Sequence, residues 1–238
     1  MSQQRNIGYE IKYQLLMSAI GLVIVFVLTI YPPTAPEFAW RKPIIGSIFS
    51  TFCILGILAV FSPNQCRKIV NIKKQNTDHK IAKPVVHADP NVLQGHHPTC
   101  GKYSAHTFQV NGKTFCAACV GLLFGGLFAL AGAVAYFFCG WNIFGNSSLI
   151  VLLGIVGVCI GLFQFKFKSQ LRLMANTIFV LGALLLLIGV DKSVHNIFFD
   201  LFVISLIVFW LLIRISLSQL DHEIICSNCE TENCMSRQ

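Results

Sequence analysis

The chain has 238 residues, of which 55% are hydrophobic and only 12% charged, and its formal net charge is +8. A soluble domain of this size needs far more polar residues to cover its surface. The composition therefore excludes an ordinary soluble enzyme, a disordered protein and a small secreted disulfide scaffold, and it is typical of a multi-pass membrane protein.

Long apolar runs follow one another along the chain at 13–31, 43–62, 118–139, 147–165, 173–190 and 196–217. Each can cross ~30 Å of hydrocarbon as a helix, which satisfies its own backbone hydrogen bonds. The run at 173–190 is the shortest and carries Asn176. We expect an all-α integral membrane bundle of six transmembrane helices. Its parts are an N-terminal helical hairpin (1–62), a basic loop (63–117), a four-helix part (118–217) and a Cys-rich tail (218–238).

The distribution of lysine and arginine predicts the orientation of these spans. With the N-terminus in the cytosol, fifteen basic residues fall on the cytosolic side and three on the other. Cytosolic loops of membrane proteins carry such an excess. We therefore expect both termini, the basic loop and the tail in the cytosol.

The loop after the second run begins with a basic cluster, Arg67, Lys68, Lys73 and Lys74. Basic residues beside a membrane attract anionic lipid headgroups, so we predict lipid binding here. No aromatic residue lies between positions 67 and 83, and binding of nucleic acid would favour aromatic residues among the basic ones. We expect no nucleic-acid partner.

Two pairs of soft ligands flank a predicted hairpin in the same loop. His97 and Cys100 precede Asn111-Gly112, the strongest short hairpin signal, and Cys116 and Cys119 follow it. This layout is typical of a zinc-ribbon-like site, in which a hairpin brings four tetrahedral ligands together. His96 and His106 are alternates for the imidazole ligand. Reduced, metal-free thiols packed at the bilayer surface are the simpler alternative, and a redox dithiol is a third.

The tail holds a second set of candidate ligands, with the spacing His-x3-Cys-x2-Cys-x4-Cys. These are His222, Cys226, Cys229 and Cys234. Cysteines clustered in the reducing cytosol are typical of metal sites rather than disulfides. The tail binds a second zinc ion, shares one site with the loop, or carries reduced cysteines alone.

Residues 96–126 resemble an uncharacterised prokaryotic family of multi-span membrane proteins, a domain of unknown function. The resemblance rests on His97-x-x-Cys100, Phe108 and the Cys116-x-x-Cys119-x-Gly121 motif before a glycine-bearing span. The chain departs from the family pattern at His106-Thr107, where an Arg-Ser pair is expected, and at Ala118, where arginine is usual. The resemblance implies a shared fold element and no activity.

Two features of the spans allow further predictions. Gly121, Gly125, Ala129 and Ala133 recur four residues apart, so we expect close helix packing within the bundle and a central position for this span. Asp200 lies near the non-cytosolic membrane edge, where we expect it to reach water or pair with Lys192.

These observations favour a non-enzymatic role. We expect a structural zinc ion to hold a cytosolic module against the bundle as a docking or assembly surface for a protein partner. The alternative is a membrane thiol-redox or metal-handling enzyme that uses Cys116 and Cys119. A small-solute transporter ranks lowest, because the centres of the spans carry no charged residue.

Overall fold

The computed structural model describes residues 2–33, 38–61, 106–110, 113–141 and 145–227. The helices of this part are α1 (Ser2–Ile30), α2 (Arg41–Phe61), α4 (Ala117–Ala133), α5 (Ser147–Leu162), α6 (Ser169–Val194) and α7 (Ile197–Ser227). A π-helical segment, η3 (Val134–Phe138), extends α4, and a 3-10 turn, η4 (Gln164–Lys166), follows α5. The predicted helical fold class is confirmed.

Five of the described helices are long and apolar enough to cross a membrane, namely α1, α2, α4 with η3, α6 and α7. The predicted span at 147–165 forms the apolar helix α5, which has 16 residues. Such a helix is about 24 Å long, shorter than the ~30 Å hydrocarbon core. The structure thus supports a multi-pass membrane bundle, and the count of six spans stays a prediction.

Two helices are longer than the apolar runs that predicted them. The run expected to be the shortest, 173–190, belongs to α6, which has 26 residues. The last run was expected to end at 217, but α7 continues to Ser227 and includes the first ten residues of the predicted tail. In these extensions Ser169 of α6 donates to the backbone of Thr107, and Asp221 of α7 accepts from Arg172 of α6.

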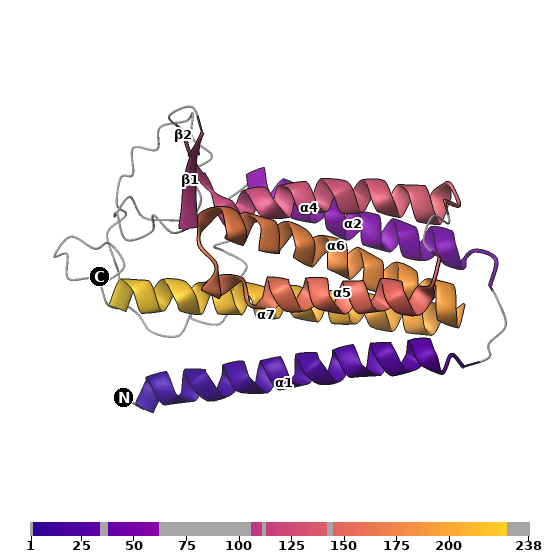
Figure 1. Cartoon of the computed structure of the whole chain (residues 1–238), viewed down its shortest axis with the longest axis horizontal. Helices are drawn as coiled ribbons and strands as arrows, with labels where there is room; N and C mark the ends of the chain where they lie inside the picture. Colours follow the sequence, from indigo (N-terminus) through magenta and orange to yellow (C-terminus); the bar gives the residue numbers. More distant parts are fainter. Residues whose placement is uncertain (1, 34–37, 62–105, 111–112, 142–144, 228–238) are drawn as a thin grey trace, which may run out of the picture.

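The helices lie side by side along the long axis of the molecule, with α1 at its edge (Figure 1). The start of α1, the end of α7 and a β-hairpin all lie at one end of the bundle. We call this the hairpin end and the opposite one the far end. The orientation of both termini toward the cytosol stays a prediction.

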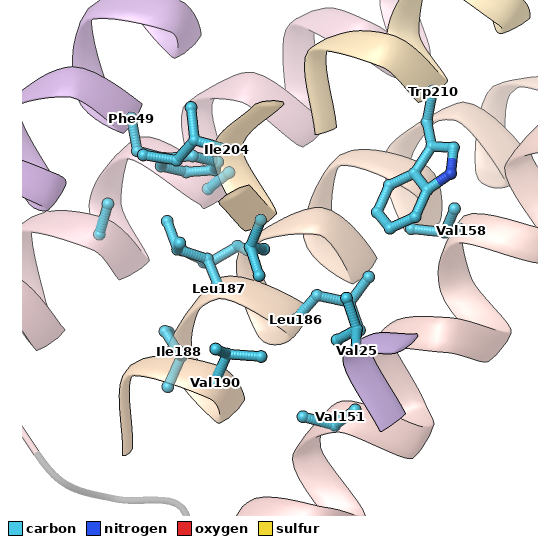
Figure 2. Close-up of a cluster of buried hydrophobic side chains, with 14 of the residues drawn as sticks. Val25, Phe49, Val151, Val158, Leu186, Leu187, Ile188, Val190, Ile204 and Trp210 are labelled. Carbon is cyan, nitrogen blue, oxygen red and sulfur yellow. The ribbon is translucent and has the colours of Figure 1, made fainter. Parts of the chain in front are cut away.

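The centre of the bundle is α6, not the span at 118–139 that the small residues had indicated. Its most apolar stretch is 61% buried, against 33% or less for the other four candidate spans. In Figure 2, Leu186 and Leu187 of α6 lie among buried side chains from four other helices, namely Val25, Phe49, Val151, Val158, Ile204 and Trp210. Small residues permit close contact, but α6 is the helix against which both α4 and α5 pack.

Glycines make these close contacts possible. A Cβ atom at Gly157 of α5 would lie 2.9 Å from the Cα atom of Gly182 in α6 and 3.0 Å from the oxygen of Ile178. One at Gly125 of α4 would lie 2.9 Å from Val180 of α6. The small-residue faces therefore pack within the chain, as predicted.

The predicted hairpin is confirmed. Strands β1 (Thr107–Val110) and β2 (Lys113–Cys116) pair antiparallel, with Thr107 opposite Cys116 and Val110 opposite Lys113. The rings of Phe108 and Phe115 stack across the strands with centroids 5.9 Å apart. Strand β2 ends at Cys116 and α4 begins at Ala117, so the hairpin leads without a linker into the membrane bundle.

Candidate functional site

The two described cysteines of the predicted zinc site lie at the junction of β2 and α4. Cys116 has extended backbone angles and is the N-cap residue of α4, and Cys119 lies in the first turn of the helix. Cys116 is buried, Cys119 is half-buried, and both are thiols rather than a disulfide. The N-terminus of a helix favours thiolate over thiol. The junction therefore suits metal ligation and thiol chemistry alike.

The remaining predicted ligands cannot be placed beside them. His96, His97 and Cys100 lie outside the described residues, as do Cys229 and Cys234 and the predicted lipid-binding residues Arg67, Lys68, Lys73 and Lys74. His222 and Cys226 belong to the last turns of α7, but their side chains are not described. Within the described residues no group of three or more His, Cys, Asp or Glu side chains could hold a metal ion. Both four-ligand sites stay predictions.

His106, the alternate imidazole ligand, takes part in a charged network. Its Nδ1 contacts Nη1 of Arg172 in α6, and its Nε2 lies 3.6 Å from Oδ2 of Asp221 in α7. Nη2 of Arg172 donates to the same Asp221 oxygen over 2.6 Å. The hydroxyl of Ser169 also donates to the carbonyl oxygen of Thr107, at 3.1 Å. These contacts anchor the first strand of the hairpin to α6 and α7.

A second arginine lies deeper at the same end. Arg214 of α7 donates through Nε to Oδ1 of Asn176 over 2.7 Å and through Nη2 to Oε1 of Gln164 over 3.2 Å. Asn176 in turn donates to the carbonyl oxygen of Arg172 over 2.6 Å. Arg172, Arg214, Asn176 and Gln164 are all at most 4% exposed. Because its side chain bonds to Arg214 and to the backbone of Arg172, Asn176 can lie buried within the apolar run of α6.

The hairpin-end cluster consists of His106, Gln164, Arg172, Asn176, Arg214 and Asp221. Among these six side chains, Arg172 pairs with the single carboxylate, that of Asp221, and Arg214 donates to amide oxygens. Arg214 also interacts electrostatically with Cys116 and Cys119. A guanidinium group this close to two cysteines favours their thiolate form and would also favour an anionic metal centre.

The far end of the bundle holds a second buried cluster, formed by Arg41, Tyr136, Asp191 and Asp200. Nη1 of Arg41 donates to Oδ1 of Asp191 over 2.5 Å and to Oδ2 of Asp200 over 2.7 Å. The Tyr136 hydroxyl donates to Oδ2 of Asp191 over 2.8 Å. The far-end cluster joins α2, η3, α6 and α7, and its arginine and two carboxylates are at most 1% exposed.

The prediction for Asp200 was wrong. Asp200 is fully buried and pairs with Arg41, while Nζ of Lys192 donates to the carbonyl oxygen of Gly145 over 2.9 Å. The count of basic residues includes three arginines that the structure buries, Arg41, Arg172 and Arg214, and the sequence analysis predicts none of them as a site residue. Each lies at the end of an apolar run, which could have indicated burial, but the partners lie on elements distant in sequence.

A comparison of the chain with protein-family models, curated proteins and solved structures found no significant match. The resemblance of residues 96–126 to a family therefore stays a prediction. The function has to be argued from the residues themselves.

Proposed function

We propose that this protein is a membrane scaffold whose hairpin end carries a structural zinc site, with Cys116 and Cys119 as two of the four ligands. His97 and Cys100 complete the set. The zinc ion would fasten the segment around residues 97–100 to a hairpin that is itself fixed to the bundle. The resulting rigid module would serve as a docking surface for a cytosolic protein.

The position of the two cysteines is the observation that carries this proposal. Cys116 ends a strand and Cys119 lies in the first turn of the following helix, so the hairpin and α4 hold both backbones in place. The hairpin is tied to α6 through Ser169 and Arg172. Half of a four-ligand site is thus pre-organised, which reduces the entropy cost of binding a metal.

The charges around the thiols also support zinc. A Zn²⁺ ion held by three thiolates and one imidazole is a net anion. The hairpin-end cluster has one more guanidinium group than carboxylates, and Arg214 interacts with both thiols. Buried arginines stabilise an anionic centre that they can approach, and the centre in turn compensates their charge.

The burial of Cys116 favours a structural role over thiol exchange. Cys116 is 6% exposed, whereas a redox thiol has to meet its partner disulfide directly. A metal ligand needs no such access once the ion is bound. The thiol-redox alternative is therefore weaker than the structural one, and the experiment below separates them.

The test is the zinc content of the full-length protein, purified in detergent and measured by elemental mass spectrometry. We expect bound zinc in the unmodified chain and its loss in Cys116→Ser and in Cys100→Ser. Cys139→Ser is the matched control, because Cys139 is exposed and lies near the far end of the bundle. That variant should keep its zinc.

A variant with Cys226, Cys229 and Cys234 all replaced by serine assigns the role of the tail. Retention of one zinc ion per chain would place the site in the loop alone, and loss of all zinc would show that the tail completes it. An unmodified chain without zinc contradicts the proposal. In that case rapid modification of Cys119 by a thiol reagent at neutral pH would support the redox alternative.

A further inference from the structure

The far-end cluster has an unequal number of positive and negative groups. One guanidinium group, that of Arg41, contacts two carboxylates, and both contacts are made by the single nitrogen Nη1. The same nitrogen lies 3.3 Å from the carbonyl oxygen of Asp191. If both carboxylates were ionised, the cluster would carry an excess negative charge in a place with almost no exposure to water.

Among the described residues, the guanidinium group of Arg41 is the cation that pairs with the two carboxylates. Lys42 and Lys192 directly follow cluster residues in the sequence, and His195 lies between Asp191 and Asp200. Nζ of Lys42 lies 5.1 Å from the centre of the Tyr136 ring, Lys192 is bonded to Gly145, and His195 is exposed. Tyr136 donates a neutral hydroxyl.

The hydrogen bonds show where the imbalance is concentrated. Both oxygens of Asp191 accept a hydrogen bond, from Arg41 and from Tyr136. Asp200 uses only Oδ2, and its Oδ1 is buried without a partner, as are Nε and Nη2 of Arg41. An unbonded carboxylate oxygen in an apolar interior is costly, and it becomes much less so when it carries a proton.

We propose that the far-end cluster is a proton-binding site in which Oδ1 of Asp200 takes up one proton from the adjoining solvent. The cluster then contains one guanidinium ion, one carboxylate (Asp191) and one neutral carboxylic acid, so its charges balance. Two carboxylates that share one site commonly hold a proton in this way. Because α2, η3, α6 and α7 meet here, the bound proton stabilises the far end of the bundle.

A metal ion fits the cluster less well. In the described residues no third His, Cys, Asp or Glu accompanies the two carboxylates. The guanidinium group already lies between them, so a divalent ion would meet a positive charge at the point of coordination. A proton requires only the free oxygen of Asp200. A monovalent metal ion such as Na⁺ is left as an outcome of the test.

The proposal makes a definite prediction for pH. Because the folded protein holds a proton that an unfolded carboxylate would release, stability should decrease as the pH rises from about 5 to about 8. We expect the melting temperature of the detergent-purified full chain to fall by about 4 °C over this range. In Asp200→Asn the fall should disappear, since asparagine resembles the protonated acid in shape and charge.

Infrared difference spectroscopy observes the proton directly. The unmodified chain at neutral pH should show the carbonyl stretch of a buried carboxylic acid. The band should be absent from Asp200→Asn. It should also vanish in Asp191→Asn, because Asp200 alone then balances Arg41 and ionises. Asp221→Asn is the control: Asp221 is partly exposed and pairs with Arg172 at the other end, so this variant should keep the band.

Three results would overturn the proposal. The first is an unmodified chain without a carboxylic-acid band, which needs no variant to fold. The second is a band that persists in Asp200→Asn. The third is a melting temperature that depends on replacement of Na⁺ by choline at constant pH, which would assign the site to a metal ion.

Discussion

Both ends of the bundle bury arginine, but they compensate its charge in opposite ways. At the far end one guanidinium group faces two carboxylates. At the hairpin end Arg172 pairs with the carboxylate of Asp221, while the amides of Asn176 and Gln164 accept from Arg214. Among the described side chains of the two clusters, the far-end cluster therefore has more carboxylates than guanidinium groups, and the hairpin-end cluster has more guanidinium groups than carboxylates.

The difference indicates what each end lacks. A buried surplus of charge is unfavourable, so each cluster favours a ligand of the opposite sign. For the far end we infer a proton, and for the hairpin end an anionic zinc–thiolate centre.

Replacement of Arg41 tests the comparison most strongly. Arg41→Met leaves the buried carboxylate of Asp191 and the buried side chain of Asp200 without a cation, and we expect it to lower the free energy of unfolding by about 3–5 kcal/mol. Thermal unfolding in detergent, followed by circular dichroism, measures this. Arg41→Lys retains a cation and should lose less. Equal loss in both variants would show that packing of the guanidinium group matters more than charge.

Glycine substitutions test whether the two ends differ in packing as well as in charge. Gly121 lies at the hairpin end against Leu173 and Asn176, and Gly189 lies near the far end against Val151. We expect each alanine variant to lose about 2 kcal/mol from overpacking. Gly56→Ala is the control, because no atom lies within 4 Å of its added Cβ. Unequal losses at Gly121 and Gly189 would mean that packing contributes to the difference between the ends.

Replacement of Arg214 should have a smaller effect than replacement of Arg41. Arg214→Met leaves the oxygens of Asn176 and Gln164 without their donor, which costs about 1–3 kcal/mol, but it also removes part of a positive surplus. We expect a net loss of about 1 kcal/mol by the same unfolding measurement. We also expect weaker zinc binding in a competition titration with a chelator. Unchanged zinc affinity would contradict electrostatic support of the site by Arg214.

The smallest effect should come from Asp221. Its carboxylate is 22% exposed and pairs with a buried arginine, so water screens part of the interaction. We expect Asp221→Asn to cost only about 0.5 kcal/mol, because the asparagine oxygen can still accept a hydrogen bond from Arg172. Hydrogen exchange of the backbone amides of β1 and β2 should increase, because Asp221 helps to hold His106 and Arg172 together. Unchanged exchange would show that Ser169 is sufficient to anchor the strand.

Local signals in the sequence predicted the elements well. Apolar runs of membrane-spanning length identified the helices, and Asn111-Gly112 between alternating residues identified the hairpin. Small residues four positions apart identified the faces of close packing. Each of these features depends on residues close together in the sequence, so the local sequence pattern is sufficient to predict it.

The sequence by itself determined a helical membrane bundle with a hairpin leading into its third apolar run, and the residue types that make a zinc site plausible. Only the tertiary structure decided that α6 is the central helix and that Arg41 lies with Asp191 and Asp200. Arg41 is separated from Asp191 by 150 residues, and Arg172 from Asp221 by 49. The count of basic residues in the loops treats these arginines as exposed to water, because the sequence does not show which helices are neighbours. The packing of α6 against the other helices brings the partners together, and their burial converts ordinary charges into candidate sites.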